Sequence, residues 1–394
     1  MLKGDQALTD FIRQTIRQTG PVSFAWLMEQ ALYHPELGYY SSGRCAIGRR
    51  GDYFTNVSVG PLFGRLLAAQ FAEMWEALGR PIDFVIVEQG AHHGDFARDV
   101  LGALRERAAD FFSTLRYCII EPFPVLQQRQ TEALRDFDGK VTWEKSLIDL
   151  EPFCGVHFSN ELLDAMPVRL ISYVALDPQN AAHRAAATGG WQERRVAESG
   201  DGFGFVTAPI TDAVLLQHLE TIPRHPGGAY ETEVNLAALR WIETLAPKLT
   251  RGYVLTVDYG HCRESYYAPE RSSGTIQSYA HHRINPSPLT HIGGADITAH
   301  VDWTSVASSA EKQGLAVAGF TDQHHFVTGV ATALIPKQFD ADAEAKTRRA
   351  LQTLLHPEFL GTIFQFLALT KNVPAGVPLS GFKFARDPRV TLGL

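Results

Sequence analysis

The chain has 394 residues, of which 45% are hydrophobic and 20% are charged, with a formal net charge of −7. The length allows a large core and more than one domain, and the composition is that of a globular protein. The negative charge and the lack of a basic tail argue against general affinity for nucleic acid or for an anionic membrane.

The cysteines argue against a disulfide framework or a zinc site, because they are far apart and form no C-x-x-C pair. We therefore expect reduced thiols and a cytoplasmic protein of a prokaryote. No apolar run is long enough to span a bilayer. The first twenty residues lack the apolar core of a signal peptide, and their acidic residues argue against a transit peptide. The four cysteines are Cys45, Cys118, Cys154 and Cys262.

The first sixty residues predict two helices and a loop. Apolar residues recur at helical spacing from Leu8 to Ile16, and a Gly-Pro pair at 20–21 ends the pattern. Ser23 can cap a second helix at 24–33. The Gly- and aromatic-rich segment that follows is long for a loop without regular structure, which is typical of functional or disordered segments. Its aromatic residues argue against disorder, so we interpret it as a lid loop.

From residue 61 the pattern alternates between helices and apolar strands. Near-continuous apolar strands alternating with helices predict a parallel sheet covered on both faces. Helices are predicted at 62–78, 95–108 and 125–134, and strands at 84–87, 117–120, 140–143 and 155–159.

Two segments interrupt this pattern. Residues 168–233 alternate as β-strands do, and we interpret them as an inserted antiparallel element. Residues 261–300 are irregular and rich in His, Pro, Gly and Tyr, and we interpret them as a substrate-recognition insert. The remaining predicted elements are a helix at 234–249, a sheet strand at 253–257, a helix at 302–313, edge strands at 316–319 and 363–369, and a helix near 345–355. The predicted domains are thus 1–60, a core at 61–167, 234–260 and 301–394, and the two inserts.

The most informative segment is the apolar strand at 84–87, which breaks into EQGAHHGD at 88–95. Doubly wound α/β proteins hold nucleotide-like cofactors at such a junction. Glycines let the backbone approach the ligand, and the following helix offers free N–H groups at its N-terminus. Such a turn also occurs without any ligand, so further observations are needed.

Polar residues also follow other predicted strands. Ligands bind at the carboxyl ends of the strands in an open parallel sheet. A carboxylate at the end of the strand after the Gly-rich loop, here Glu121, can accept from both hydroxyls of an adenosine ribose. Glu121 lies 31 residues after Gly90, whereas a dinucleotide fingerprint places its acid about 20 residues on and requires G-x-G-x-x-G. This favours an adenosine cofactor other than NAD. The marked strand ends are Glu88 with Gly90, Glu121, Asn160 with Glu161, and Asp258 with Tyr259.

Several segments, in the same order, resemble the MidA/NDUFAF-type family of class I S-adenosylmethionine-dependent methyltransferases. They are ALYHPELGYY (31–40), IGRRGDYFT (47–55), PLFG (61–64), the loop at 88–94, SNELLDAMPV (159–168), WQERRV (191–196), VDYGH (257–261), GTIQSYAHH (274–282) and DITAHVDW (296–303). The resemblance covers most of the chain. It implies an α/β, Rossmann-like sheet, mostly parallel and seven-stranded, with an N-terminal helical region and inserted recognition elements. The mitochondrial members are protein arginine methyltransferases that help assemble respiratory complex I.

The resemblance implies S-adenosylmethionine as cofactor. The family loop resembles E-x-G-P-G-x-G, and here His92 replaces the middle glycine and Ala91 the proline. Glycine at this point lets the backbone approach the cofactor. Whether His92 permits the same approach therefore decides between an active enzyme and a silent protein. The residues assigned to the cofactor are Glu88, Gly90, Ala91, His92, Gly94 and Glu121, the lid residues Asp52, Phe54 and Thr55, and Ser146 and Leu147. The alternative for the lid residues is a structural turn at Gly51.

Methyl transfer from a sulfonium is an in-line displacement, and it needs both reactants held in line. A guanidinium acceptor also needs carboxylates to bind its N–H fork and to help it lose a proton. The predicted catalytic and acceptor-binding residues are Glu161, Asp164, Asn160, Asp258 and Tyr259. The alternative for 160–164 is a simple helix cap. Tyr279, His282, Asp296 and His300 are assigned to substrate recognition.

Three functions follow as hypotheses. The first is methyl transfer to a protein arginine, with a protein as partner. The second, motivated by His92, is a catalytically silent assembly factor that keeps the fold and binds a partner protein. The third, an NAD-dependent oxidoreductase, is disfavoured by the loop spacing. No metal is expected, because the paired histidines at 92–93, 281–282 and 324–325 lack an H-E-x-x-H or C-x-x-C framework.

Overall fold

The computed structural model describes residues 4–43, 55–173, 190–223, 229–280, 283–334, 341–374 and 376–394. The chain divides into two compact units, each assembled from three stretches. Unit 1 comprises Met1–Tyr53, Leu163–Arg240 and His261–Asp302, and unit 2 comprises Phe54–Leu162, Trp241–Gly260 and Trp303–Leu394. Every helix within the described ranges is too short or too polar to cross a membrane.

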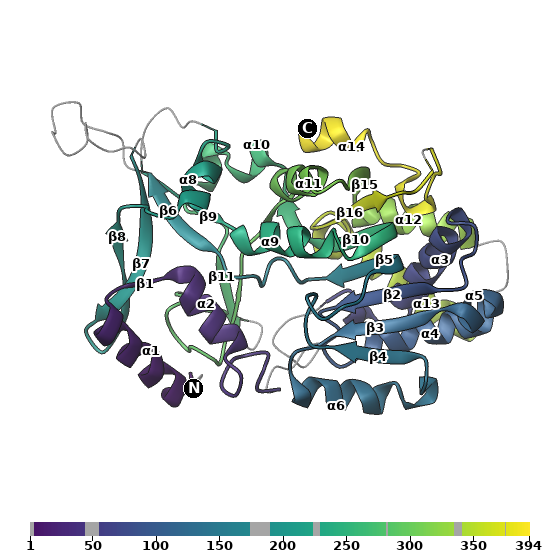
Figure 1. Cartoon of the computed structure of the whole chain (residues 1–394), viewed down its shortest axis with the longest axis horizontal. Helices are drawn as coiled ribbons and strands as arrows, with labels where there is room; N and C mark the ends of the chain where they lie inside the picture. Colours follow the sequence, from purple (N-terminus) through teal and green to yellow (C-terminus); the bar gives the residue numbers. More distant parts are fainter. Residues whose placement is uncertain are drawn as a thin grey trace. The chain divides into compact units, whose positions relative to one another are not determined.

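Unit 2 is built on a sheet with the strand order β15-β16-β10-β5-β2-β3-β4 (Figure 1). The pairs from β10 to β4 are parallel, and β16 runs antiparallel to both of its neighbours. The expected Rossmann-like, mostly parallel α/β sheet is therefore confirmed. The strands are β2 (Phe84–Gln89), β3 (Arg116–Ile120), β4 (Val141–Glu144), β5 (Phe153–Asn160), β10 (Leu249–His261), β15 (Ala316–Asp322) and β16 (Phe364–Lys371).

Helices cover both faces of this sheet. On one face, α3, α4, α12 and α13 share a core with the strands, in which Phe158 of β5 packs between Phe71 and Phe96 at ring distances of 5.6 and 4.5 Å. On the other face Trp241 of α9 packs against His157, because neighbouring side chains of a strand point to opposite sides. The helices are α3 (Leu62–Ala77), α4 (Asp95–Arg107), α5 (Ala109–Thr114), α6 (Pro124–Ala133), α9 (Leu236–Leu245), α11 (Trp303–Lys312), α12 (Gln323–Leu334), α13 (Ala341–Leu355) and α14 (Pro388–Leu392), with short turns η1 (Val57–Val59), η2 (Arg135–Phe137), η4 (Pro357–Gly361) and η5 (Ser380–Phe382).

Two predicted elements are wrong in their extent or place. The helix predicted at 234–249 spans only Leu236–Leu245. Asn235 begins it by accepting from the N–H of Ala238 at 2.9 Å, and Pro247 prevents its continuation. The strand predicted at 363–369 is not at the edge, since β16 lies between β15 and β10. The sequence pattern also gave no indication of α12.

Unit 1 contains the N-terminal helices and the inserted elements. Strands β1, β7, β6 and β9 form an antiparallel sheet in this order, with β8 beside β7. A smaller sheet has the order β12-β11-β13. The elements are α1 (Gln6–Thr19), β1 (Val22–Ser23), α2 (Phe24–Tyr33), β6 (Arg169–Tyr173), β7 (Trp191–Ser199), β8 (Gly202–Ala208), α8 (Ala213–Leu219), β9 (Tyr230–Val234), α10 (Arg263–Tyr266), η3 (Pro269–Arg271), β11 (Gln277–Ala280), β12 (Arg283–Ile284), β13 (Asp296–Thr298) and β14 (Val301–Asp302).

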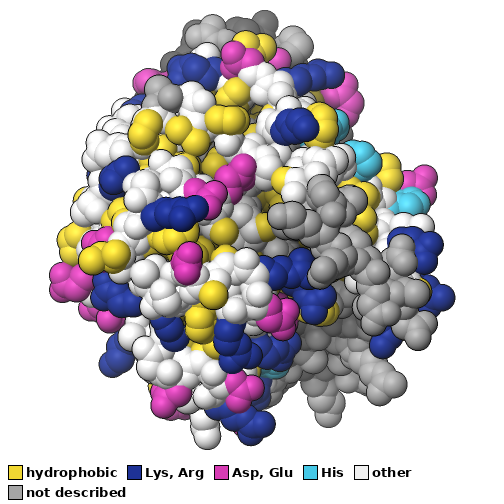
Figure 2. All heavy atoms as spheres, turned by 90° about the vertical axis from the view of Figure 1, so that its right-hand side faces the viewer, with side chains coloured by type: hydrophobic (Ala, Val, Ile, Leu, Met, Phe, Trp, Pro, Cys, Tyr) yellow, Lys and Arg dark blue, Asp and Glu magenta, His cyan; other side chains and the backbone are white. Residues whose placement is uncertain are grey.

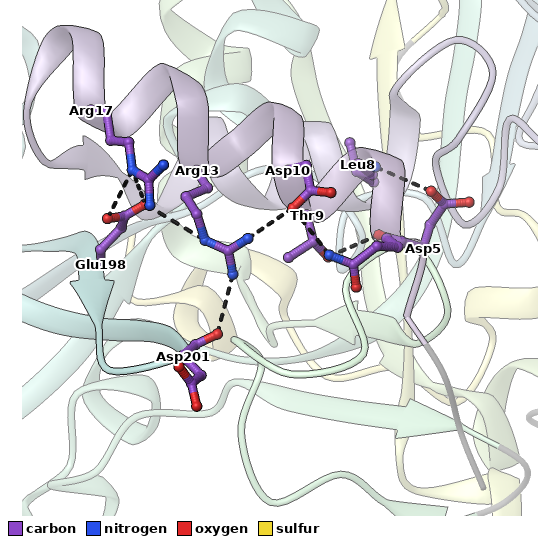
Figure 3. Close-up of polar contacts among 9 residues, drawn as sticks. Asp5, Leu8, Thr9, Asp10, Arg13, Arg17, Glu198 and Asp201 are labelled. Atoms are coloured by element: carbon purple, nitrogen blue, oxygen red, sulfur yellow. Dashed lines mark hydrogen bonds and ion pairs between the residues drawn. The ribbon is translucent and has the colours of Figure 1, made fainter.

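Polar contacts fix α1 to the β7–β8 hairpin (Figure 3). Asp5 caps the helix by accepting from the N–H of Leu8 at 3.1 Å. Arg13 donates to the carbonyl of Asp201 at 3.1 Å, and Arg17 pairs with Glu198 at 2.9 Å. Exposed ion pairs contribute little stability, so the buried face of α1 holds it in place and these contacts set its register on the hairpin.

Charged side chains of both signs are interspersed on the face drawn in Figure 2, which is the right-hand side of Figure 1. Apolar side chains lie between them. A mixed surface of this kind agrees with the net charge of −7 and differs from the extended basic area that a polyanion requires.

Gly155 allows the three central strands of unit 2 to approach one another. It has φ +151°, and a Cβ there would lie 2.0 Å from the carbonyl oxygen of Val85. Its neighbour Gly252 is under the same constraint, since a Cβ would lie 1.9 Å from the carbonyl oxygen of Gly155.

We expect Gly155→Ala to lower the free energy of unfolding by more than about 3 kcal/mol, measured by urea denaturation. Gly102→Ala is the matched control. Gly102 lies in α4 with no atom within 4 Å of an added Cβ, so its replacement should be neutral or stabilising by about 1 kcal/mol. Equal effects of the two substitutions would contradict the constraint.

Candidate active site

The Gly-rich loop between β2 and α4 is a tight turn with three residues at positive φ. These are Gly90 (+87°), His92 (+47°) and Gly94 (+83°). The N–H of Gly94 donates to the carbonyl of Ala91 at 2.8 Å, and Gly94 is the N-cap of α4. A Cβ on Gly90 or Gly94 would make only ordinary contacts, so backbone conformation and not space calls for glycine. The turn leads directly into the N–H groups of the first turn of α4.

His92 adopts the left-handed conformation for which glycine is usual. Histidine is among the side chains that tolerate this region. The carbonyl oxygen of His92 accepts from Nε2 of Gln130 at 2.9 Å. Its ring stacks on that of His93 with a centroid distance of 3.7 Å. The histidine therefore fits a loop of this shape.

Glu121, immediately after β3, presents a buried carboxylate. Its Oε1 accepts from the N–H of Phe123 at 3.0 Å, and its Oε2 accepts from Nε2 of Gln130 at 2.8 Å. Burial raises the pKa of this carboxyl to about 7, and these two hydrogen bonds oppose the rise. Each carboxylate oxygen can accept a further hydrogen bond, so both can receive one from a ribose hydroxyl.

The ends of β5 and β10 bring four predicted residues together. Val257 of β10 is the register partner of Asn160 of β5, so the residues that follow both strands are neighbours. Oε1 of Glu161 accepts from Nδ2 of Asn160 at 2.8 Å, and Oε2 accepts from the hydroxyl of Tyr259 at 3.1 Å. Glu161 has φ +54°, a conformation that is strained for a glutamate and that clusters at functional sites.

Asp258 holds the backbone on both sides of the Glu161 contacts. It is fully buried, and its two oxygens accept from the backbone N–H groups of Tyr259 at 2.8 Å and Leu162 at 3.1 Å. Its carboxylate thus holds the turn that carries Glu161. Asn56, which the sequence did not single out, is also fully buried and donates to Oδ1 of Asn160 at 3.1 Å.

The other predicted cofactor residues make separate local contacts. Glu88 accepts from the hydroxyl of Tyr117 at 2.7 Å in the core, where burial raises its pKa to about 7. Thr55 Oγ1 and Ser58 Oγ are 3.0 Å apart at the start of η1. Ser146 donates to Asp149 at 2.7 Å. Buried Leu147 follows it in the connection to β5. Asp52 and Phe54 lie outside the described residues.

Some predicted residues belong to unit 1. Asp164 is buried there, and its backbone carbonyl accepts from the N–H of Ala299 at 2.9 Å. Asp296 accepts from the hydroxyl of Tyr40 at 2.7 Å, and His300 Nδ1 lies 3.1 Å from His261 Nε2. Tyr279 lies in β11 and is partly buried, and His282 lies outside the described residues. Over the described ranges, no group of three or more His, Cys, Asp or Glu could hold a metal ion.

Comparison with known proteins identifies the family of this chain. A model of a family of S-adenosyl-L-methionine-dependent methyltransferases matches residues 66–321. The chain belongs to this family. It is also similar to a COG1565 superfamily member of Burkholderia thailandensis solved with S-adenosyl-homocysteine bound, with a TM-score of 0.84 and 30% identity over 98% of this chain and 96% of that one. A second, native structure of a COG1565 superfamily protein from this organism gives a TM-score of 0.82 at 29% identity.

Relatives with assigned activities cover nearly the whole chain. The mitochondrial NDUFAF7 homologue of Drosophila melanogaster, named a protein arginine methyltransferase, is 27% identical over 96% of this chain and 89% of its own length. Human NDUFAF7, also named a protein arginine methyltransferase, is 26% identical over 95% of this chain and 85% of its own length. The chain is thus a methyltransferase with S-adenosylmethionine as cofactor, and the left-handed loop and the open acceptor positions of Glu121 fit that cofactor.

Cofactor binding should depend on pH through Glu121. An ionised carboxylate accepts stronger hydrogen bonds from ribose hydroxyls than a protonated carboxyl does, and burial raises the pKa of Glu121 to about 7. Affinity for S-adenosylhomocysteine should therefore rise with pH through about 7 and level off above it, as measured by calorimetry from pH 5.5 to 9. Glu121→Gln should weaken binding by about 10- to 100-fold and flatten the profile. A native affinity that does not change over this range would contradict the assignment.

Two substitutions at His92 test whether its left-handed backbone is what matters. His92→Gly should retain S-adenosylhomocysteine binding within a few-fold and change stability by less than about 1 kcal/mol. His92→Val places a β-branched side chain at the same φ and should destabilise by about 1 to 2 kcal/mol and weaken binding. The opposite result, in which only the glycine variant binds the cofactor, would show that the native chain is catalytically silent.

Proposed function

We propose that this chain methylates the guanidinium group of an arginine in a protein substrate. The observation that carries the proposal is the carboxylate of Glu161, which Asn160 and Tyr259 hold in one orientation at the carboxyl end of the sheet. The names of the Drosophila and human relatives support the same acceptor.

The chemistry of the acceptor suits this carboxylate. An arginine side chain is planar, stays protonated and presents N–H groups in a fork that pairs with both oxygens of a carboxylate. Oε1 of Glu161 accepts from Asn160 and Oε2 accepts from Tyr259. A carboxylate has about four lone-pair sites, so it can accept from protein donors and from a guanidinium fork together. Pairing would hold positive charge on two guanidinium nitrogens and leave the third to react.

Bound S-adenosylmethionine supplies an electrophilic methyl group on a sulfonium. As the N–CH₃ bond forms and the C–S bond breaks, the attacking nitrogen must lose a proton. In this proposal Glu161 is the carboxylate that pairs with the acceptor, and it can take up the proton or pass it to solvent. The turn held by Asp258 keeps Glu161 in place during transfer.

The family resemblance makes a subunit of respiratory complex I, or of its bacterial counterpart, the first protein to test as substrate. The hypothesis of a silent assembly factor rested on His92, and the fit of His92 in the loop removes its motivation. The cytoplasmic location expected from the sequence stays a prediction.

Glu161→Gln separates acceptor binding from cofactor binding. We expect S-adenosylhomocysteine affinity within a few-fold of native, and methyl transfer lower by about 100-fold or more, because the fork loses its charged partner. Glu132→Gln, at an exposed position of α6, is the matched control and should keep full activity. The measurement is transfer of labelled methyl groups to a lysate from a strain lacking this protein. The modified residue is then identified by mass spectrometry.

Labelled mono- or dimethylarginine that disappears with Glu161→Gln would support the proposal. Methyl groups found on lysine, glutamine or a carboxylate would overturn the assignment of the acceptor while leaving the methyltransferase activity intact. A Glu161→Gln enzyme as active as the Glu132→Gln control would overturn the role of Glu161.

A further inference from the structure

Gln130 is a fully buried amide on a helix that is otherwise mostly polar. It follows Leu126 by four residues, so the two share the inward face of α6. A buried amide is costly unless its polar atoms are hydrogen-bonded. The identity of its partners therefore shows what the side chain is for.

The partners of Gln130 come from three separate parts of the sheet, two connections and one strand. Its Nε2 donates to the carbonyl of His92 at 2.9 Å and to Oε2 of Glu121 at 2.8 Å. Its Oε1 accepts from the indole N–H of Trp143 in β4 at 2.9 Å. One side chain thus joins the Gly-rich loop, the carboxylate after β3, and β4.

Trp143 determines which way the amide faces. An indole N–H can only donate, so Oε1 of Gln130 must point toward Trp143. The NH₂ group must then point toward the two acceptors, and its two hydrogens match them one to one. The amide has a single orientation that satisfies every partner, and this orientation fixes both acceptors.

We propose that Gln130 is a positioning residue for the cofactor, which orients the carboxylate of Glu121 toward the ribose and holds the His92 turn in its left-handed conformation. The proposal rests on the assignment of S-adenosylmethionine to this site. It adds that affinity depends on a residue that need not touch the ligand, because Gln130 acts through Glu121 and through the loop backbone.

Other charged groups beside this network are few among the described residues. Nε2 of His93 lies 2.9 Å from Arg129, and burial together with Arg129 lowers the pKa of His93. This lowered pKa favours the neutral form of His93. Asp95 is the remaining charged neighbour that affects His93. Burial also raises the pKa of Glu88 to about 7, and this carboxyl accepts from Tyr117. Because Gln130 donates to Glu121, a shift of the pH midpoint caused by a Gln130 variant reports on Glu121.

Gln130→Met tests the proposal because it keeps the length of the side chain and removes both hydrogen-bonding functions. We expect affinity for S-adenosylhomocysteine at pH 7.5 to fall about 10-fold or more, with the pH midpoint of binding about one unit higher, because Glu121 loses a donor to its charged form. Gln128→Met, at an exposed position of the same helix, is the matched control and should match the native protein in both.

A second variant keeps the test decisive if the first does not fold. Gln130→Glu preserves an acceptor for Trp143 but places a carboxyl beside Glu121. Two adjacent carboxyls share one proton, so affinity should be highest when the pair holds it and should fall as pH rises, the reverse of the native trend.

Each outcome bears on one assignment. A native affinity and native pH midpoint in either folded Gln130 variant would overturn the positioning role. Lower thermal stability with unchanged affinity and midpoint would assign Gln130 to structure alone and would also overturn it. Failure of the native protein to bind S-adenosylhomocysteine would instead overturn the cofactor assignment, and this result is separate from the comparison among variants.

Discussion

The parallel pairing of β5 with β2 and β10 is the constraint on which the site depends. It places the carboxyl ends of three strands at one edge of the sheet, so the polar residues that follow these strands become neighbours. Gly155 and Gly252 lie in this pairing at points where an added Cβ would meet the backbone of the neighbouring strand. A shift of β5 by one residue would turn Phe158 away from the core and His157 into it, so packing and function require the same register.

Strong local patterns made most of unit 2 predictable from the sequence. Short apolar runs such as 84–87 and 117–120 between helical patterns favour buried strands, and acids at their ends mark the ligand-binding edge. The predicted helix at 234–249 failed at both ends for local reasons, a cap at Asn235 and Pro247, which an apolar pattern alone does not reveal. The position of β16 inside the sheet depends on non-local pairing with β10 and β15, and no local pattern contains that information.

The site residues divide in the same way. Glu121 and Glu161 follow strands directly, so position in the chain was enough to select them. Gln130 and Asn56 do not follow strands directly. They matter because they hydrogen-bond to Glu121 and Asn160, which do. A glutamine on a polar helix looks like a surface residue, and only a count from Leu126 places it inward. Asp258 was selected by its position too, yet its oxygens serve the backbone, a distinction that requires coordinates.

The burial of Glu121 has a consequence for how the enzyme responds to its surroundings. Burial raises the pKa of this carboxyl to about 7, and its ionised form accepts the stronger hydrogen bonds from a ribose. Cofactor binding at Glu121 would therefore release, on average, a fraction of a proton per molecule. By linkage, protonation of Glu121 and cofactor binding oppose each other. A cofactor held by Glu121 would therefore bind more weakly as the pH falls through about 7. In that case one buried side chain would couple cofactor occupancy to the acidity around the protein.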